Sequence, residues 1–257
     1  MHSKEADRGP QTPFLLTTSW DDGHPLDLLI AELLTKYDLR GTFYVPLHNS
    51  RPTMSPSQIR ELAGSFEIGA HTVNHVRLTA LNENDARREI EDSKKQLEDL
   101  LGKPCMVFCF PGGRYRDVHL RMVRDAGFSG ARTVELLSLQ RPRIDTGISL
   151  IPTTIQARPH HIGAYLRNAI KRLSFGALRT PFLDRRAKSW PELARVLLQC
   201  ALDRGGVFHL WGHSWEIEET GQWHALNQTL ACVSEYARTA PCITNSELCA
   251  LQQPVYS

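Results

Sequence analysis

The sequence predicts an α/β domain built on a mainly parallel sheet, either open or closed into a barrel. Short apolar runs that suit buried strands alternate along the chain with longer amphipathic segments that suit helices. The length of 257 residues also fits, since one (β/α) barrel commonly takes about 250 residues. We expect a single domain over residues 14–250, preceded by a flexible N-terminus over residues 1–13.

Apolar runs predict the strands of this sheet. The first covers residues 14–20 and ends at an acidic pair. Short apolar runs bounded by turn residues are typical of strands buried on both faces of a parallel sheet. Between residues 135 and 159 the pattern weakens into Arg, Pro and Thr, which predicts loops and short strands. The other predicted strands are 41–45, 66–70, 106–110, a short strand reached through 127–131, and 207–211.

The clearest predicted helix spans residues 82–101. Asn82 can cap its first turn, apolar side chains recur on one stripe, and Gly102 is a stop signal. Residues 25–37 and 55–63 predict two more helices, because each has proline near its first position, where proline is favoured. The remaining predicted helices are 116–126, 162–173, 190–202 and 222–238.

Composition excludes several classes of protein. Lys plus Arg is 30 and Asp plus Glu is 28, so the net charge of +2 gives no reason to expect a nucleic-acid partner. No run of about 18 apolar residues is present, so we expect no membrane span. The first residues lack the apolar core of a secretory signal, which favours a cytoplasmic location. The six cysteines form no CxxC pair, so we expect reduced, mostly buried thiols.

Four polar clusters share one position, since each directly follows a predicted strand. The carboxyl ends of parallel strands meet at one edge of a sheet, and active sites of α/β folds lie there. Residues far apart in the sequence are therefore expected to meet at this edge. The clusters are Asp21-Asp22-Gly23, residues 71–75 (HTVNH), Pro111-Gly112-Gly113 and Gly212-His213-Ser214.

The first two clusters together indicate a metal site. His71 and His75 can reach one ion from a single turn, but 11 histidines produce such pairs by chance, and hydrogen-bonded or surface histidines are the alternative. Asp21 and Asp22 strengthen the case, since two adjacent carboxylates in a partly buried site need a cation. A helix-capping turn would explain only one of them. Two histidines with one carboxylate suit catalytic Zn²⁺.

The other two clusters supply the remaining parts of a hydrolase. The second Asp is free to accept a proton from water. Gly112 lets backbone N–H groups approach an oxyanion, although a plain turn is the alternative. His213 provides a proton donor for a leaving amine. The combination predicts metal-assisted hydrolysis of an amide or ester.

At these residues the sequence resembles the polysaccharide deacetylase family, carbohydrate esterase family 4, which carries the NodB homology domain. The resemblance covers roughly residues 14–216 and rests on an ordered set of motifs, TSWDDG at 18–23, HTVNH at 71–75, FCFPGG at 108–113 and LWGH at 210–213. It implies a distorted (β/α) barrel, usually with seven strands. It also implies one divalent metal ion, most often Zn²⁺, with Co²⁺, Ni²⁺ or Mn²⁺ as alternatives, and removal of N-acetyl or O-acetyl groups from sugars.

The resemblance also implies roles for six residues of this sequence. They are Asp21 as the catalytic base, Asp22, His71 and His75 as the metal ligands, Gly112 as a backbone donor to the oxyanion, and His213 as the catalytic acid.

Two departures from the family pattern concern the base and the acid. The family often has an Arg paired with the base where this chain has Cys109, and a thiol cannot supply that charge. We expect Arg132 or Arg114 to take this role. The late motif is shifted, so His209 is a rival acid. We prefer His213, because His209 falls within the predicted strand.

A third departure is that no residue clearly matches the family's Asp that orients the acid, for which Asp145 and Asp184 are the candidates. Substrate contacts are expected nearby, at Trp215, Glu216 and Arg132. Trp215 can stack on a sugar ring, although core packing is the commoner use of a tryptophan, as for Trp211 and Trp223. Glu216 can bind a sugar hydroxyl or hold a local ion pair. The basic stretch 179–188 is expected to be a solvated loop.

These observations predict a metal-dependent carbohydrate N-deacetylase that releases acetate. The expected substrate is an acetylated sugar, oligosaccharide or nucleotide-sugar. One alternative keeps the fold and metal but acts on a small non-sugar amide, as cytoplasmic amidohydrolases of this superfamily do. The other is a non-catalytic carbohydrate-binding relative. The oligomeric state stays open.

Overall fold

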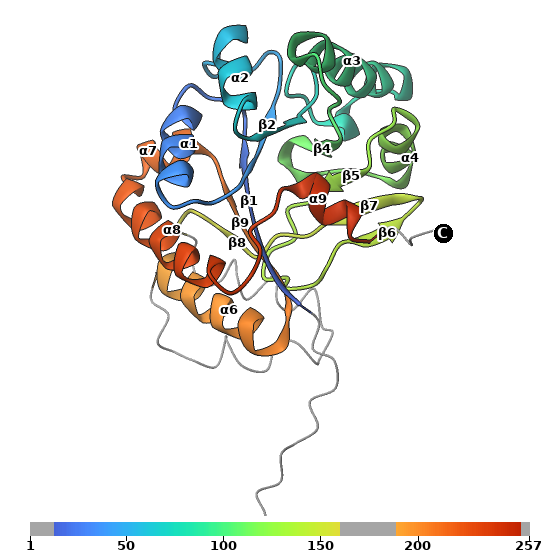
Figure 1. The fold of residues 1–257 in the computed structure, drawn as a ribbon. Helices are drawn as coiled ribbons and strands as arrows, with labels where there is room; N and C mark the ends of the chain where they lie inside the picture. Colours follow the sequence, from blue (N-terminus) through green and yellow to red (C-terminus); the bar gives the residue numbers. More distant parts are fainter. Residues whose placement is uncertain (1–12, 160–188, 253–257) are drawn as a thin grey trace, which may run out of the picture.

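A computed structural model describes residues 13–159 and 189–252 (Figure 1). Four expectations lie outside these residues: nearly all of the flexible N-terminus, the helix over 162–173, Asp184, and the basic loop over 179–188. Among the described residues, no helix combines the length and apolar character needed to cross a bilayer.

One curled, mixed sheet, which forms half of a barrel, is the frame of the molecule (Figure 1). Its strand order is β6-β7-β5-β4-β3-β2-β1-β9-β8, and every neighbouring pair is parallel except β6 with β7. The strands are β1 (Phe14–Asp21), β2 (Thr42–Val45), β3 (Glu67–Ala70), β4 (Val107–Cys109), β5 (Gly130–Arg132), β6 (Arg143–Asp145), β7 (Ile148–Ile151), β8 (Ile155–Gln156) and β9 (Gly206–Gly212).

The predicted α/β class with a mainly parallel sheet is confirmed, but the expected count of seven strands is wrong, because the described residues form nine. The difference arises in the segment where the sequence pattern was weak. There β6, β7 and β8 are only two to four residues long. β6 pairs with its neighbour β7, whereas β7 and β8 are held in the sheet by strands further away in the sequence, β5 and β9. Ile155 of β8, for example, pairs with Leu210 of β9.

Helices surround the sheet (Figure 1). The helix α3 follows its prediction closely: the Asn82 side chain accepts a hydrogen bond from the Asp85 N–H, and Gly102 ends the helix with φ +64°. In α2 the Ser55 side chain forms the expected cap. The helices are α1 (Asp27–Lys36), α2 (Pro56–Ala63), α3 (Glu83–Leu101), α4 (Asp117–Asp125), α6 (Trp190–Arg204), α7 (Ser214–Glu219), α8 (Trp223–Ala237) and α9 (Asn245–Ala250), with 3-10 turns η1 (Leu78–Ala80) and η2 (Pro111–Gly113).

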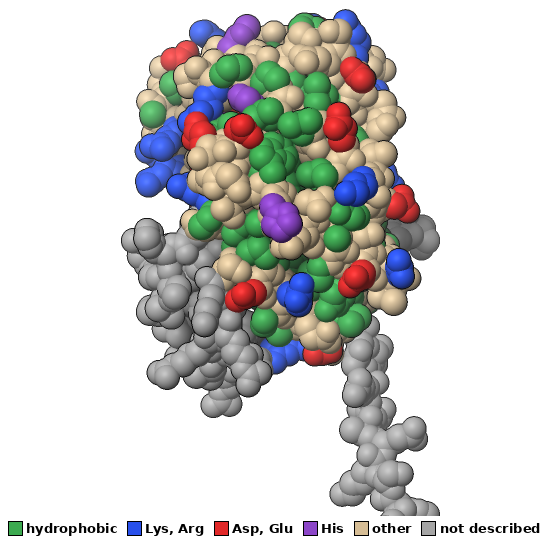
Figure 2. Space-filling view, turned by 90° about the vertical axis from the view of Figure 1, so that its left-hand side faces the viewer, with side chains coloured by type: hydrophobic (Ala, Val, Ile, Leu, Met, Phe, Trp, Pro, Cys, Tyr) green, Lys and Arg blue, Asp and Glu red, His purple; other side chains and the backbone are tan. Residues whose placement is uncertain are grey.

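The helices α7 and α9 were not predicted. Both are only six residues long, too short to show a helical apolar period. The face that carries α1, α7 and α8 shows side chains of both charges interspersed with small apolar areas (Figure 2). This face therefore carries no single large area of one charge.

Parallel pairing places the functional clusters together. The strands β1, β3, β4 and β9 all run in the same direction, so their carboxyl ends share one edge of the sheet. Register adds detail, because Trp20 of β1 pairs with Gly212 of β9, and Cys109 of β4 pairs with Arg132 of β5. The residues that directly follow these strands therefore lie around one point.

Candidate functional site

Three side chains converge at the edge where the strands end. The Nε2 atom of His75 lies 2.9 Å from Oδ1 of Asp22, and Nε2 of His71 lies 3.5 Å from the same oxygen. Yet this buried oxygen accepts no hydrogen bond from the residues that the structure describes. One carboxylate oxygen and two imidazole nitrogens that approach without hydrogen bonding form a set that fits a divalent cation such as zinc.

Neighbouring groups set the orientation of these side chains. Nδ1 of His71 lies 2.8 Å from the carbonyl oxygen of Cys109, so the ring turns Nε2 toward Asp22. Glu89 of α3 accepts hydrogen bonds from the backbone N–H groups of Val73 and Asn74, and thereby holds the loop between the two histidines. Its other oxygen accepts from the side-chain amide of Asn74 at 2.6 Å. The role of Glu89 was not predicted, since these contacts depend on how α3 packs against the loop, which sequence patterns do not display.

The backbone at this site is strained. Asp22 has φ +80° and His75 has φ +50°, in the region that favours glycine. Such residues cost about 1–3 kcal/mol each and cluster at functional sites. The carboxyl of Asp22 is ionised: burial acts to raise its pKa, but the adjacent imidazoles of His71 and His75 lower the pKa well below its ordinary value.

Asp21, the neighbour of Asp22, is buried against Arg132. The Arg132 guanidinium donates to Oδ2 of Asp21, whereas Oδ1 has no hydrogen-bond partner among the described residues. Burial acts to raise the pKa of Asp21, but the charge of Arg132, followed by those of His71 and His213, lowers the pKa below its ordinary value. Arg114, the other candidate partner, is exposed after η2 and has no recorded contact with Asp21.

Cys109 occupies the strand position beside Arg132. Its Sγ lies 3.9 Å from Oδ2 of Asp21, and burial raises the pKa of the thiol well above its ordinary value. The thiol therefore stays neutral. Because Cys109 and Arg132 are paired in register across β4 and β5, the guanidinium reaches Asp21 from one strand further along the sheet.

The two candidate acids have different surroundings. His209 lies inside β9, where its Nε2 is 2.9 Å from the Ser19 hydroxyl and its Nδ1 is 2.9 Å from the Pro152 carbonyl. Burial lowers the pKa of His209 to about 3. His213, by contrast, follows β9 and directs Nε2 toward the Asp pair, 3.9 Å from Oδ2 of Asp21 and 4.0 Å from Oδ2 of Asp22.

Glu216 orients His213. Its Oε2 lies 2.8 Å from Nδ1 of His213, and Gln156 and Arg158 donate to its two oxygens at 2.9 and 2.6 Å. Burial acts to lower the pKa of His213, but the Glu216 hydrogen bond and nearby carboxylates raise the pKa above its ordinary value. Of the two aspartates considered for this position, Asp145 lies on the edge strand β6. The only sequence signal for this role of Glu216 was its position three residues after His213, which becomes informative once α7 is known to begin at Ser214.

The remaining predicted residues lie around this centre. Gly112 lies in η2 with φ +65°, and an added Cβ atom would lie 3.1 Å from Nε of Arg77, so both backbone and space favour glycine there. Trp215 donates from Nε1 to Oδ2 of Asp22 at 2.8 Å, and the Arg51 guanidinium stacks 3.5 Å from the centre of its ring. Trp223 donates to Glu218 instead.

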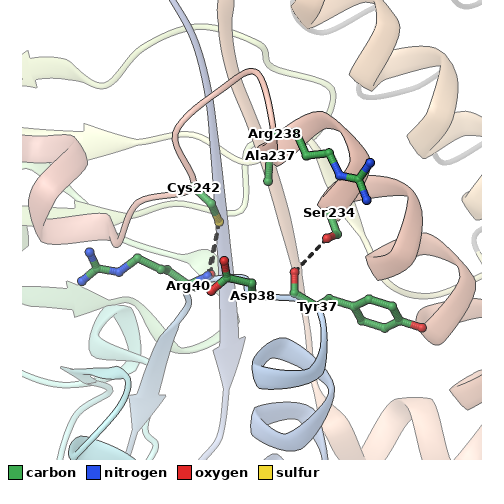
Figure 3. Close-up of a pocket in the computed structure, with 7 residues that line it drawn as sticks. All are labelled: Tyr37, Asp38, Arg40, Ser234, Ala237, Arg238 and Cys242. Carbon is green, nitrogen blue, oxygen red and sulfur yellow. Dashed lines mark hydrogen bonds between the residues drawn. The ribbon is translucent and has the colours of Figure 1, made fainter.

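A separate surface hollow of about 460 Å³ contains none of these residues (Figure 3). Two of its polar side chains are already engaged: the Ser234 hydroxyl donates to the Tyr37 carbonyl, and the Cys242 thiol donates to the Arg40 carbonyl. Two arginines and one aspartate line it, so it has no single charge that defines a ligand. Its lining residues are Tyr37, Asp38, Arg40, Ser234, Ala237, Arg238 and Cys242.

The fold and the edge cluster define an α/β domain with a candidate metal site at the edge of its sheet. Residues 8–131 match the model of the family described as polysaccharide deacetylase, and the chain belongs to this family. The motif resemblance found in the sequence is thereby confirmed.

Two curated bacterial relatives are similar over part of the chain. The Bacillus subtilis protein YxkH, assigned by name to the polysaccharide deacetylases, is 25% identical over 156 residues, which are 56% of each protein. The peptidoglycan-N-acetylglucosamine deacetylase of Bacillus cereus is 26% identical over 122 residues, 46% of this chain and 56% of that protein. The chain therefore spans about half the length of the curated relatives it matches.

A solved structure shares the fold over nearly the whole chain. A Mycobacterium smegmatis protein assigned to the polysaccharide deacetylases superimposes with a TM-score of 0.67 at 18% identity, and the match covers 95% of this chain and 91% of that one. At this identity the likeness shows the fold alone. The likeness of fold covers nearly the whole chain and is therefore not confined to residues 8–131, where the family model matches.

Proposed function

We propose that the protein is a metal-dependent carbohydrate deacetylase that hydrolyses an N-acetyl group and releases acetate. One observation carries the proposal. Next to the set formed by Asp22, His71 and His75 lie an ionised carboxylate, Asp21, and an imidazole, His213, whose Nε2 is 3.9 Å from Asp21. A base and an acid beside one metal position are the parts that amide hydrolysis requires.

Asp22, His71 and His75 would hold the metal ion, which we propose to be Zn²⁺, with Co²⁺, Ni²⁺ and Mn²⁺ as alternatives. When bound, such an ion polarises the acetyl carbonyl and lowers the pKa of a bound water. Among the described residues three protein ligands converge, which would leave further coordination positions of the ion for water and substrate. His71 is supported in this role by its hydrogen bond to the Cys109 carbonyl.

Asp21 is the proposed general base. Its Oδ1 is buried and has no hydrogen-bond partner among the described residues, so it is available to take a proton from the attacking water. Arg132 fixes the other oxygen and keeps the carboxyl ionised. A base must begin deprotonated, and the lowered pKa of Asp21 meets that condition.

Gly112 and His213 complete the proposed reaction. The backbone N–H of Gly112 would donate to the oxyanion as the acetyl carbon becomes tetrahedral. His213, protonated at Nε2 and held through Nδ1 by Glu216, would give its proton to the departing amine. The raised pKa of His213 favours the protonated form that an acid needs.

The proposed substrate is an N-acetylated sugar, as an oligosaccharide, polymer or nucleotide-sugar, with O-acetyl esters as a secondary possibility. The name of the Bacillus cereus relative, a peptidoglycan-N-acetylglucosamine deacetylase, supports an N-acetylated sugar. The partial match to that relative leaves the particular sugar a matter for assay.

Two variants test the proposal. Asp21→Asn should abolish acetate release yet keep the metal, because Asp21 is not among the proposed ligands. His71→Ala should lose both metal and activity. Acetate release from N-acetylated sugars and small non-sugar amides, with and without chelator, identifies the substrate class. Retained turnover in a verified Asp21→Asn protein would refute Asp21 as the base, and bound metal without turnover on any substrate would favour a non-catalytic binder.

A further inference from the structure

We propose that Trp215 is a positioning residue for the metal ligand Asp22, and that Arg51 holds Trp215 in place. The inference rests on the metal site of the proposed function, formed by Asp22, His71 and His75. It assigns to Trp215 a role that differs from the sugar stacking expected from the sequence.

The two oxygens of Asp22 have separate partners. Oδ1 faces the Nε2 atoms of His71 and His75, at 3.5 and 2.9 Å. Oδ2 accepts a hydrogen bond of 2.8 Å from Nε1 of Trp215. A tryptophan N–H can only donate, so it marks one oxygen as the acceptor and leaves the other for the cation. The hydrogen bond of Trp215 thereby fixes the rotation of the carboxylate about its Cβ–Cγ bond.

This support matters because Asp22 is not held by an ordinary backbone. Its φ of +80° is costly for a residue with a side chain, so local preference does not keep the carboxylate in place. Without the indole donor, Oδ2 would have His213 as its nearest other positive group, with Nε2 4.0 Å away. A carboxylate turned in that direction would no longer present Oδ1 squarely to the two histidines.

Trp215 is itself held on two sides. Arg51 lies over the indole at 3.5 Å from the ring centre and donates to Oε1 of Glu219 at 2.7 Å. The preceding residue, Ser214, donates to the buried carboxyl of Asp27 at 2.5 Å, which fixes the start of α7. Since Arg51 covers one face of the indole, that face is not open to a sugar ring, and the N–H is the group of Trp215 that serves the site.

The test compares two Trp→Phe variants. Trp215→Phe keeps an aromatic ring but removes the donor to Asp22, and Trp223→Phe is the matched control, because Trp223 also donates to a carboxylate, that of Glu218. We expect Trp215→Phe to weaken Zn²⁺ binding about 10–100-fold, the usual effect of losing a group that orients a metal ligand. Trp223→Phe should change the dissociation constant less than twofold. Binding is measured by chelator competition on the full chain stripped of metal.

The Co²⁺-substituted proteins give a second readout that general destabilisation does not move. The visible absorption of bound Co²⁺ reports ligand geometry, so its bands should shift in Trp215→Phe and stay unchanged in Trp223→Phe. Should Trp215→Phe fail to fold, Arg51→Gln keeps the indole donor but removes the stacked cation and its exposed ion pair with Glu219, and it should weaken Zn²⁺ binding several-fold. Unchanged affinity and spectrum in the Trp215→Phe or Arg51→Gln protein, or equal losses in both Trp→Phe variants, would overturn the inference. Because metal binding is measured without substrate, absent turnover would contradict the proposed function and leave this inference standing.

Discussion

The base side and the acid side of the candidate site are built differently. On the base side, the side chains of Asp21 and Arg132 extend from strands and are 4% and 0% exposed. On the acid side, His213 precedes a short helix and is 18% exposed, and Arg158, which pairs with Glu216, is 45% exposed. The base side is buried in the sheet, whereas the acid side reaches solvent.

This difference matches what each side must do in the proposed reaction. A base that starts ionised is best kept beside a permanent charge, which Arg132 supplies to Asp21. The guanidinium of Arg132 is in turn stabilised by the rings of Tyr44 and Trp211, whose centres lie 5.4 and 4.7 Å away. An acid that must regain a proton after each turnover needs access to water. The buried charge of Asp21 is therefore expected to be sensitive to removal of Arg132. Glu216 should be much less sensitive to removal of its exposed partner Arg158.

The largest effect is expected when the base side loses its cation. Arg132→Ala should lower kcat/KM at least about 100-fold, since general-base catalysis contributes about 10²–10⁴-fold. It should also destabilise the fold by about 3–5 kcal/mol, because the Asp21 charge would remain buried without its partner. Acetate release and urea unfolding measure the two losses.

Two further variants separate charge from bulk at this position. Arg132→Lys keeps the charge and should recover part of the stability, and Arg114→Ala, which removes an exposed arginine, should leave both measurements near those of the unmodified protein. If Arg114→Ala proves as damaging as Arg132→Ala, the base side is not organised around the Asp21–Arg132 pair.

A smaller and pH-dependent effect is expected on the acid side. Burial opposes the charged form of His213, but its hydrogen bond to Glu216 raises the pKa. Activity needs protonated His213, so the alkaline limb of kcat/KM should lie above the ordinary histidine range. Glu216→Gln removes the carboxylate, lowers the pKa of His213 and moves that limb to lower pH, with activity at pH 8 falling about tenfold.

Arg158→Gln is the control for this shift. It removes the exposed partner of Glu216 but leaves the carboxylate in place, and solvent screens the charge of Arg158, which is 45% exposed. Its alkaline limb should not move to lower pH. An identical pH profile of kcat/KM in Glu216→Gln and the unmodified protein would show that Glu216 does not raise the pKa of His213.

The sequence predicted the base side and the metal set better than the acid side, for physical reasons. Asp21, Asp22, His71 and His75 each follow an apolar run, and parallel pairing brings such positions to one edge whatever the exact register. The choice between Arg132 and Arg114 depended on register, since only the pairing of Cys109 with Arg132 shows which arginine faces Asp21.

Glu216 and Trp215 were harder to place. Their roles depend on α7 beginning at Ser214, and a six-residue helix has no apolar period to reveal it. The short strands between residues 143 and 156 were similarly undefined, since β7 and β8 are held by the distant strands β5 and β9, and β6 is a three-residue edge strand that pairs only with β7. Sequence reasoning therefore succeeded where one strand end decided a position and failed where a long-range contact did.

The smallest effect is expected at Asp27. Its hydrogen bond with Ser214 connects α1, which follows the base-side strand β1, to α7 on the acid side. This buried carboxyl begins α1 and accepts from Ser214 at the start of α7, and its Oδ2 has no partner among the described residues. Burial raises the pKa of Asp27 well above its ordinary value, with further increases from Asp22 and Asp21 that outweigh the Ser214 hydrogen bond. Asp27 is thus a neutral carboxylic acid in the folded protein over a pH range in which the unfolded chain carries its charge.

That difference fixes the sign of the pH dependence. Between the unfolded and folded pKa values of Asp27 the folded state binds more protons, so this group makes stability fall as pH rises through that window. Asp27→Asn cannot ionise and keeps an oxygen for Ser214, so its melting temperature should match that of the unmodified protein near pH 4 and exceed it increasingly toward pH 9. Each kcal/mol of difference in the free energy of unfolding should appear as about 2–4 °C in the melting temperature. Asp38→Asn, at an exposed aspartate, is the control and should show no such trend. A pH-independent difference for Asp27→Asn would mean that Asp27 is ionised in the folded protein. The contact between α1 and α7 would then contain a buried charge rather than a neutral carboxylic acid.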